Sequence, residues 1–484
     1  MSSRPASLLV LTALFLLFGR CTPAEDPAPE PPNIVFILAD DLGIGDLPSY
    51  NPEAQTVTPH LDRLAAAGMR FTDAHAPGAW CVPSRYGLLT GRHPHRASMG
   101  AWTERALIDS SQTTLATLLR DRGYATYMVG KWHLGFEGGT DYDCSHPLRG
   151  GPVDHGFDRY FGIPSSLDIP PYFYIRGDAC VAAPTDSIGD NQSDPAIWTD
   201  IQGAFWRGGG IAPGFAHRDV LPRLRQESVA YLNAHAEERG DQPFFLYLAL
   251  TAPHTPWLPP DSLRGTTETG LYGDFVRHVD LAVGRVLETL DQRGLAENTL
   301  VVFTSDNGPV WYPKDEQRFG HRSTDVYRGM KGDAWEGGHR MPFIARWPDR
   351  IPANTTNDQL ITLTDMLATF ADLSGPGLPE TARTDGHSLH PLLQSAQDTI
   401  ARDGAVHYTG TYLAIREGPW KLIPGLGSGG FTSPRTRDPA PGEPAGQLYH
   451  LGNDPSEQNN LYDAHPDVVA RLQDRLERYR QQRP

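Results

Sequence analysis

The chain has 484 residues, of which 39% are hydrophobic and 21% are charged, with a formal net charge of −16. This length and composition are sufficient for one large folded core with a further layer, and the acidic residues are spread along the chain rather than held in a tail. Because the sequence contains no basic run, we expect no nucleic-acid partner, and an anionic substrate would need a local cationic pocket.

The first residues resemble an export signal. Arg4 precedes the apolar stretch 8–18, which is too short to span a membrane, so residues 1–21 are predicted to be a signal peptide. Cys21 weakly resembles a lipoprotein cleavage site, although an arginine precedes it where a small residue is expected. Soluble secretion and a lipid anchor on Cys21 both stay open. Residues 22–32 are predicted to be a Pro-rich linker, and we expect a periplasmic or extracellular protein.

Four apolar runs of strand length each end in a polar cluster. Buried runs of this kind, spaced by helical segments, are typical of parallel strands in an α/β sheet. The carboxyl ends of such strands meet at one edge of the sheet, which is where ligands bind, so the four clusters are predicted to share one pocket. The runs and the polar residues that follow them are 34–39 with Asp40 and Asp41, 124–129 with Lys131 and His133, 244–248 with His254, and 300–303 with Asp306 and Asn307.

A cysteine motif lies between the first two runs. It reads Cys81-Val82-Pro83-Ser84-Arg85 and continues to Thr90-Gly91-Arg92. Proline suits the first turn of a helix, so residue 81 is predicted to lie at a helix N-terminus, where free backbone N–H groups and the helix dipole favour an anion. An isolated cysteine is usually a small buried hydrophobe, and the meaning of this one depends on the rest of the site.

The two acidic clusters suggest a cation site. Asp-Asp and Asp-Asn after a strand are common in turns and helix caps, so neither cluster alone is specific. Together Asp40, Asp41, Asp306 and Asn307 offer three carboxylates and an amide, which suit a hard cation such as Ca²⁺. Zinc would favour more histidine or thiolate ligands.

Taken in order, these clusters resemble the motifs of the formylglycine-dependent sulfatases of arylsulfatase type, in the alkaline phosphatase superfamily. The resemblance extends over residues 33–462. It is carried by residues 33–41, the Cys81 motif, and residues 129–135, 156–158, 162–166, 252–254, 305–308, 330–338 and 448–461.

The resemblance implies a chemistry for residue 81. Cys81 would be oxidised to formylglycine by a formylglycine-generating maturation enzyme, and Arg85 would hold the hydrated aldehyde. The hydrate would attack sulfur, release the alcohol and then eliminate sulfate after His133 takes a proton. Calcium would be bound by Asp40, Asp41, Cys81, Asp306 and Asn307, and the sulfate would contact Lys131, Ser166, His254 and Lys331.

The expected activity is therefore hydrolysis of sulfate esters. Aryl sulfates are expected as surrogate substrates, and a sulfated small molecule or glycan is expected in nature. A phosphatase or phosphodiesterase of the same superfamily is the alternative, although it would be expected to carry Ser or Thr as the nucleophile and more His and Asp ligands for two zinc ions. A non-catalytic glycan-binding lipoprotein is a third interpretation, and it gives no reason for these polar clusters to occur together.

The expected fold is α/β. Residues 33–375 are predicted to form a large, mixed, mostly parallel sheet flanked by helices, as in alkaline phosphatase. Residues 376–484 are predicted to form a smaller α+β subdomain, with an antiparallel sheet from the short runs between 405 and 450 and an amphipathic closing helix.

Two further expectations concern the loops. An oxidising compartment would permit Cys144 and Cys180 to form a disulfide. The stretches 136–224 and 425–445 are predicted to be long loops that recognise substrate, with Trp206, Arg207, His217, Arg218 and Phe431 as their candidate residues.

Overall fold

The computed structural model describes residues 30–199 and 201–481, and the chain from Pro31 onward forms one compact unit. The predicted signal peptide 1–21, the predicted lipid attachment at Cys21 and most of the predicted linker 22–32 lie outside the described residues. Within the described ranges, no helix is long and apolar enough to cross a membrane.

The larger sheet has eleven strands among the described residues. Its central neighbours are parallel, whereas antiparallel pairs occur toward both edges. In spatial order the strands are β12 (Thr355–Asn357), β2 (Met69–His75), β11 (Arg340–Arg346), β10 (Thr299–Ser305), β1 (Asn33–Asp40), β9 (Phe244–Pro253), β3 (Ala125–Lys131), β4 (Arg159–Ile163), β5 (Ile175–Arg176) and β6 (Ala179–Cys180), and β13 (Ile361–Thr362) also pairs with β2.

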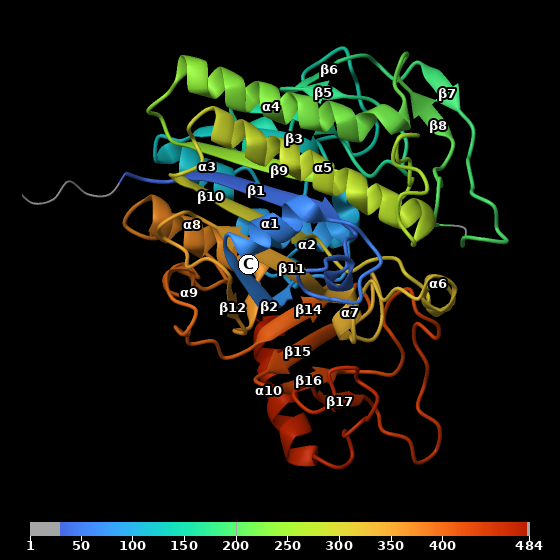
Figure 1. Ribbon diagram of the computed structural model, residues 1–484. Helices are drawn as coiled ribbons and strands as arrows, with labels where there is room; N and C mark the ends of the chain where they lie inside the picture. Colours follow the sequence, from blue (N-terminus) through green and yellow to red (C-terminus); the bar gives the residue numbers. More distant parts are fainter. Residues whose placement is uncertain (1–29, 200, 482–484) are drawn as a thin grey trace, which may run out of the picture. The chain divides into compact units, whose positions relative to one another are not determined.

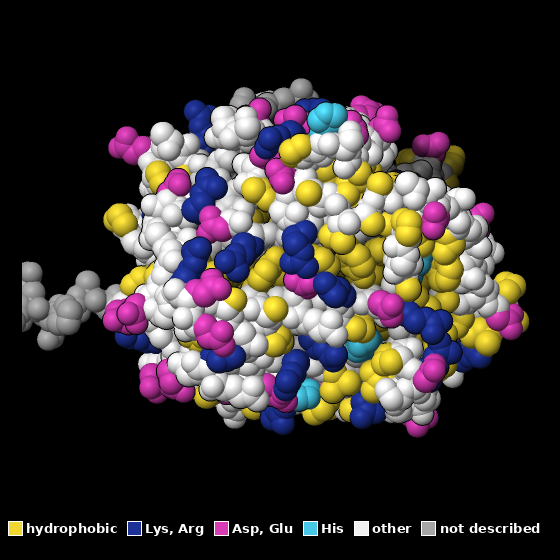
Figure 2. Space-filling view, turned by 90° about the horizontal axis from the view of Figure 1, so that it is seen from above, with side chains coloured by type: hydrophobic (Ala, Val, Ile, Leu, Met, Phe, Trp, Pro, Cys, Tyr) yellow, Lys and Arg dark blue, Asp and Glu magenta, His cyan; other side chains and the backbone are white. Residues whose placement is uncertain are grey.

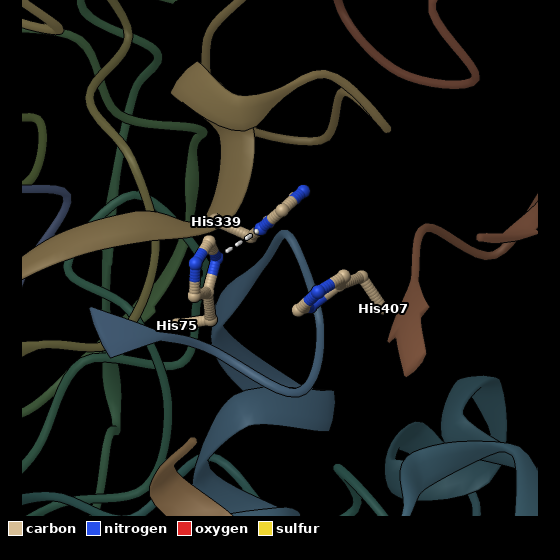
Figure 3. A group of neighbouring side chains, drawn as sticks. All are labelled: His75, His339 and His407. Carbon is tan, nitrogen blue, oxygen red and sulfur yellow. Dashed lines mark hydrogen bonds between the residues drawn. The ribbon is translucent and has the colours of Figure 1, made fainter. Parts of the chain in front are cut away.

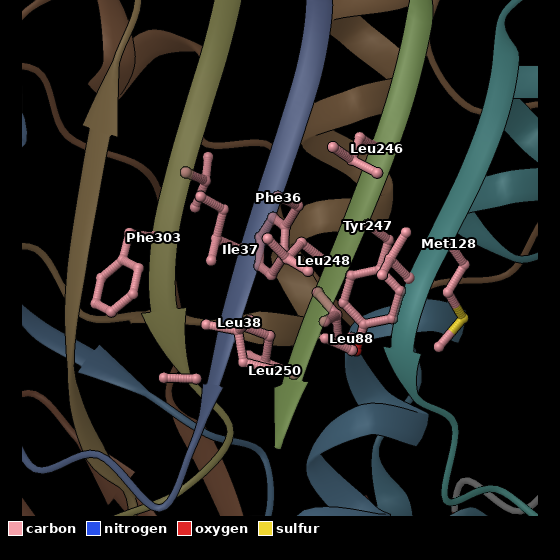
Figure 4. Close-up of a cluster of buried hydrophobic side chains, with 14 of the residues drawn as sticks. Phe36, Ile37, Leu38, Leu88, Met128, Leu246, Tyr247, Leu248, Leu250 and Phe303 are labelled. Atoms are coloured by element: carbon pink, nitrogen blue, oxygen red, sulfur yellow. The ribbon is translucent and has the colours of Figure 1, made fainter. Parts of the chain in front are cut away.

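The four predicted apolar runs form the adjacent parallel strands β10, β1, β9 and β3, which confirms the predicted sheet. Ile37 pairs with Phe303 on one side and with Leu248 on the other, and all three side chains are fully buried. Figure 4 shows apolar side chains of these strands packed together, with Leu88 from a helix beside them. Burial on both faces explains why each run is apolar without polar alternation.

Helices cover the sheet in two groups. The long helices α4 and α5 pack against each other and against β9, whereas α2, α3 and α8 pack together elsewhere on the sheet. Figure 1 shows α4 and α5 on one side of the central strands and α8 on the other. The first group is α1 (Pro59–Ala66), α4 (Val220–Glu238) and α5 (Gly270–Gln292), the second is α2 (Cys81–Thr90), α3 (Leu115–Asp121), α8 (Met366–Ser374) and α9 (His390–Gln394), and α6 (Pro313–Phe319) and α7 (Glu336–His339) are short.

Helix α2 is set up by its own sequence. It begins at Cys81, carries Pro83 in its first turn and ends before Gly91, whose φ of 66° closes the helix in the left-handed region. The predicted helix is therefore present, and residue 81 lies at its N-terminus.

A separate antiparallel sheet follows in the chain, with strands β14 (Ala405–Tyr408), β15 (Leu413–Glu417), β16 (Trp420–Ile423) and β17 (Gln447–His450). Helix α10 (Pro466–Gln481) packs on β15 and β16 through Leu472 and Leu476. This second sheet, in the red part of Figure 1, confirms the predicted fold class. The boundary at residue 375 stays a prediction.

The stretch 136–224 is more structured than the predicted long loop. It contains β4, β5, β6 and the small hairpin of β7 (Asp186–Ile188) and β8 (Gly209–Ile211), and α4 already begins at Val220. The prediction was wrong here because strands of two to five residues are too short to leave a clear periodic pattern. Cys144 and Cys180 form the expected disulfide, with their Cα atoms 5.5 Å apart.

Basic and acidic side chains are mixed on the surface. On the face shown in Figure 2, Lys and Arg alternate with Asp and Glu over the elements that lie uppermost in Figure 1. This view shows no broad basic patch.

Candidate active site

A cavity of about 580 Å³ opens at the carboxyl ends of the central strands. The predicted site residues fall into two sets around it. Those that line the cavity are Asp41, Cys81, His133, Ser166, His254 and Lys331. The others, which are bonded to this first set or to each other, are Asp40, Arg85, Lys131, Asp306 and Asn307.

Cys81 occupies the centre of the site. Its Sγ lies 3.4 Å from Lys331 Nζ and 3.5 Å from Asp40 Oδ1, and the residue is only 3% exposed. Burial raises the pKa of the Cys81 thiol well above its usual range, despite the nearby lysines. The unmodified thiol is therefore protonated at neutral pH and a poor nucleophile.

The ends of β1 and β10 bring four oxygen-bearing side chains together. The Asp41 N–H donates to Asp306 Oδ1 at 3.2 Å, and Asn307 Nδ2 donates to Asp41 Oδ1 at 2.6 Å. Asn307 Oδ1 is buried and has no hydrogen-bond partner among the described residues. A buried amide oxygen without a donor, beside three carboxylates, fits a hard cation such as Ca²⁺.

Three buried cations hold these carboxylates. Lys131 Nζ donates to Asp40 Oδ2 at 2.6 Å, and Lys331 Nζ donates to Asp41 Oδ2 at 2.8 Å. Arg85 donates from Nε and Nη2 to Asp306 Oδ2, at 3.1 and 2.8 Å. Three positive and three negative side chains balance, so a bound divalent cation would make the site net positive and suited to an anionic substrate.

Arg85 lies at the base of the site, behind Cys81. Its Nε and Nη2 donate to Asp306 and its Nη1 donates to the carbonyl of Lys131 at 3.1 Å, which uses three of its five N–H groups. The expected contact with a hydrated aldehyde at residue 81 stays a prediction. Arg85 is fully buried, and its guanidinium also lies 3.4 Å from Asp40. In this arrangement it positions the carboxylates behind Cys81.

The carboxylates differ in their ionisation. Burial alone would raise the pKa of Asp40, but the charge of Lys131, followed by other nearby cations, holds it well below its usual range. Burial and the neighbouring Asp40 carboxylate raise the pKa of Asp306 to about 6, although Arg85 opposes this.

The two predicted histidines are held differently. His254 Nδ1 lies 2.6 Å from the carbonyl of Thr255, which fixes Nδ1–H as donor and leaves Nε2 free to face Ser166 Oγ at 3.4 Å. His133 packs edge-on against Trp102, with ring centroids 4.6 Å apart, and neither ring nitrogen has a partner in the described ranges. Burial, followed by the charge of Lys131, lowers the pKa of His133 well below its usual range, so its imidazole is neutral.

Sequence reasoning missed several residues of the cavity wall. Asp168 accepts from Arg207 Nη1 at 2.5 Å through Oδ2, whereas its buried Oδ1 has no partner in the part of the chain that the structure describes. Trp80, Trp102 and Trp257 also line the cavity. The sequence contains one sign that two of them are near the site, because Trp80 directly precedes Cys81 and Asp168 closely follows Ser166. Trp102 and Trp257 reach the cavity through the packing of loops, which the sequence does not indicate.

The expected loop residues divide into two groups. Arg207 and Phe431 line the cavity. Trp206, His217 and Arg218 are not among its lining residues, and Trp206 instead stacks on His217 with ring centroids 4.6 Å apart.

A second cluster of titratable groups lies away from the cavity. Figure 3 shows His75, His339 and His407 close together. All three are fully buried, and the rings of His339 and His407 are stacked with centroids 3.9 Å apart. His407 Nδ1 lies 3.2 Å from the carbonyl of Ala76 and donates to it, which leaves its Nε2 as an unpartnered acceptor among the described residues.

The hydrogen bonds of this cluster follow one order. His75 Nε2–H donates to Asp73 Oδ1 at 2.7 Å, so His75 Nδ1 accepts from His339 Nδ1–H at 2.9 Å. His339 Nε2 then accepts from Lys421 Nζ at 3.1 Å. Each ring nitrogen of His75 and His339 has a hydrogen-bond partner. These two rings therefore need no metal ion to satisfy them.

Ion pairs surround the three histidines and join the two sheets. Their members come from β2, β11 and α7 on one side and from β15, β16 and the chain after β17 on the other. The pairs are Asp73 with Arg340 at 2.7 Å and Arg416 at 2.6 Å, and Lys421 with Glu336 and Glu457, each at 2.9 Å.

Comparison with known proteins gives one consistent result. A family model described as "Sulfatase" matches residues 32–376. An N-acetylgalactosamine-6-O-sulfatase of Bacteroides thetaiotaomicron is 35% identical over 485 residues, covering 93% of each chain. A steryl-sulfatase of Mus musculus is also 35% identical, over 85% of this chain and 73% of that protein. A solved structure from work on glycosaminoglycan metabolism by Bacteroides thetaiotaomicron superposes with a TM-score of 0.81 at 33% identity, covering 94% of this chain and 100% of that one.

Proposed function

This chain belongs to the sulfatase family and is a sulfuric ester hydrolase, and we propose that it removes sulfate from a carbohydrate through formylglycine at position 81 and a bound Ca²⁺. The observation that carries the proposal is the position of Cys81, at the N-terminus of α2 and between Lys331 and Asp40.

The thiol itself is an unsuitable nucleophile, because burial keeps it protonated and because a sulfated thiol would have no route for releasing sulfate. A hydrated aldehyde at residue 81 would supply an oxygen nucleophile and a second hydroxyl group that lets sulfate leave again. The phosphatase alternative is not supported, because the family is that of the sulfatases.

Asp40, Asp41, Asp306 and Asn307, with an oxygen at residue 81, would hold the cation. When bound, Ca²⁺ would supply positive charge at the sulfate oxygens where negative charge develops. Arg85 keeps Asp306 in place through two hydrogen bonds, so its role in this proposal is to position the ligand set.

The remaining polar residues would either contact the sulfate group or transfer protons. Lys131, whose Nζ lies 2.8 Å from Ser166 Oγ, and Lys331 would contact the sulfate oxygens. His254 faces the cavity through Nε2. As an imidazolium that keeps Nδ1–H on the Thr255 carbonyl, it would protonate the departing oxygen from Nε2 and become neutral. His133 is neutral, has two unpartnered ring nitrogens and would accept the proton of the second hydroxyl.

A sugar leaving group is supported by the polar wall of the cavity. The unpartnered Oδ1 of Asp168 is a buried acceptor beside the catalytic groups, as far as the described chain shows. A sugar hydroxyl or acetamido N–H would satisfy it, whereas a steroid or phenol offers no donor there. The relative that acts on N-acetylgalactosamine 6-sulfate supports the same choice.

We also infer export and maturation. The disulfide between Cys144 and Cys180 is typical of an oxidising compartment, which supports a periplasmic or extracellular location. The proposal requires a formylglycine-generating maturation enzyme as a partner.

The test combines three measurements on purified active protein. Peptide mass spectrometry is expected to find formylglycine at position 81, metal analysis to find Ca²⁺, and sulfate release to occur from 4-nitrophenyl sulfate and from sulfated sugars but not from the matching phosphate esters. Full activity with only a thiol at position 81, or after complete removal of metal, would refute the mechanism.

A further inference from the structure

The rim of the cavity differs in chemistry from its floor. The catalytic side chains on the floor are buried, with exposures of 3% for Cys81, 6% for Lys331 and 8% for His254. Phe431 on the rim is 46% exposed, and among the described residues it is the only aromatic side chain in the set of exposed large hydrophobic ones. An exposed aromatic ring at the mouth of a polar cavity indicates a contact surface for a ligand that extends outward.

The Phe431 ring is held in place by the backbone around it. Thr432 N–H donates to Asp333 Oδ1 at 3.0 Å, and Ser428 Oγ–H donates to the Thr432 carbonyl at 2.6 Å. A Cβ built on Gly332 would lie 3.1 Å from the Phe431 ring, so the ring packs closely over the residue that follows Lys331. Phe431 is thus a rigid platform that loses little entropy when a ligand stacks on it.

Two donors on this rim, the Arg435 guanidinium and Trp80 Nε1–H, have no carboxylate partner among the described residues. Arg435 lines the cavity, and within the described ranges its guanidinium has no carboxylate within 4.0 Å, although Nε donates to Thr411 Oγ1 at 3.3 Å. Trp80 also lines the cavity, and its Nε1–H is buried without a partner among the described residues. Arg207, in contrast, is already paired with Asp168. In a chain with a net charge of −16, an unpaired arginine at this place favours a ligand that carries negative charge.

The size of the cavity agrees with a ligand of more than one sugar. A volume of about 580 Å³ lies within the range of cavities that enclose drug-sized molecules, and it exceeds what one sulfated monosaccharide needs.

Resting on the proposed function, we propose that Phe431, Arg435 and Trp80 form a second sugar subsite, which binds an anionic sugar linked to the sulfated one. The Phe431 ring stacks on the apolar face of that sugar, Arg435 pairs with its carboxylate or second sulfate, and Trp80 Nε1–H donates to one of its oxygens. The enzyme thereby selects sulfated residues within an acidic oligosaccharide over the free sulfated sugar.

The experiment compares three kinds of substrate that share one sulfated sugar. They are N-acetylgalactosamine 6-sulfate, disaccharides in which glucuronate is linked to either side of it, and the same disaccharides with glucose in place of glucuronate. For the wild type, kcat/KM on one glucuronate disaccharide is expected to exceed that on its glucose analogue by about tenfold, because a charge-assisted contact is gained. It is expected to exceed that on the monosaccharide by more than this, because the second sugar also stacks on Phe431.

Two variants and one control assign the subsite. Arg435→Ala is expected to abolish the preference for glucuronate over glucose. Phe431→Leu keeps an apolar side chain but removes the ring, and it is expected to lower the ratio of disaccharide to monosaccharide kcat/KM about tenfold. The effect should lie in KM, since these contacts are remote from the bond that breaks. Arg437→Ala, which removes a nearby exposed arginine paired with Glu443, is expected to leave all ratios unchanged.

The outcomes separate this inference from the proposed function. Release of sulfate from 4-nitrophenyl sulfate and the monosaccharide, with no gain for any glucuronate disaccharide, would refute the second subsite alone. A gain that survives both Arg435→Ala and Phe431→Leu would also refute it. Failure to release sulfate from any of these esters would instead refute the proposed function.

Discussion

The ring nitrogens of the two histidines in the cavity contact different groups, and we expect the two residues to act in different steps of the reaction. His254 is oriented by the carbonyl of Thr255 and faces Ser166, whereas His133 lies edge-on to Trp102 without a partner in the described part of the chain. If His254 protonates the departing oxygen, its contribution grows with the basicity of that oxygen.

His254→Ala is therefore expected to lower turnover of a sugar sulfate by about 10² to 10⁴, and turnover of an activated aryl sulfate far less. A sugar alkoxide needs a proton to leave, whereas a nitrophenolate does not. Steady-state kinetics on both substrates check this. An equal loss on both, where bond cleavage limits the rate, would leave His254 only as a sulfate contact.

His133→Ala is expected to slow a later step, the release of sulfate from the enzyme. Because the alcohol has already left, the defect should be similar for aryl and sugar sulfates wherever this step limits turnover. A burst of alcohol followed by slow turnover, seen in stopped-flow traces, is the expected signature. Loss of the burst itself would contradict this role.

At the scale of elements, the close approach of β3 to β9 positions Lys131. Gly130 precedes this lysine with φ at 122°, and a Cβ built on it would lie 1.8 Å from the backbone oxygen of Ala249. Only glycine fits this place without moving one of the two strands.

Gly130→Ala is therefore expected to destabilise the protein by about 1 to 3 kcal/mol. It should also reduce kcat by displacing Lys131 from Asp40, with which it pairs at 2.6 Å. Urea unfolding and kinetics measure the two effects. As a matched control, Gly123→Ala is expected to leave kcat unchanged, because a Cβ there meets no atom within 4 Å.

The elements also show how far the sequence could predict the site. The polar ends of β1, β3, β9 and β10 were predictable, since apolar runs define parallel strands and parallel strands place their carboxyl ends together. The orientation of Arg85 toward Asp306 was not, because it depends on the distance between α2 and β10. Asp168 and Trp102 lie in irregular segments, where no periodicity indicates which side chain faces the cavity.

At the scale of the whole molecule, the buried histidines make stability depend on pH. Burial lowers the pKa of His75, His339 and His407, so the folded protein keeps them neutral while the unfolded chain protonates them near pH 6.5. Their contribution is fully present above pH 6.5 and is lost as the pH falls below it. Glu457 acts oppositely between pH 7 and about 4.5, because burial raises its pKa to about 7.

His407→Gln is expected to make the free energy of unfolding depend less steeply on pH between pH 6.5 and 5. The slope should fall by about 1.4 kcal/mol per pH unit, which corresponds to about one proton fewer taken up on unfolding. Glutamine retains an N–H donor for the Ala76 carbonyl but does not titrate. Urea unfolding across this range measures the slope. The exposed His146→Gln serves as the control and should leave it unchanged, and equal slopes for wild type and His407→Gln would exclude this cause.

The same buried network governs whether the C-terminal sheet can exist alone. Lys421 and Arg416 come from that sheet. Their partners lie outside it, with Asp73 on β2 of the larger sheet and Glu336 and His339 on α7. If the C-terminal sheet were separated from the rest of the protein, buried charges on both parts would lose their partners. The free-energy cost would be comparable to the whole stability of a domain. Residues 376–484 expressed alone are expected to show no cooperative unfolding transition by circular dichroism. The two sheets, although distinct in architecture, are then a single cooperative folding unit, and the smaller one is not a module that could be exchanged between proteins.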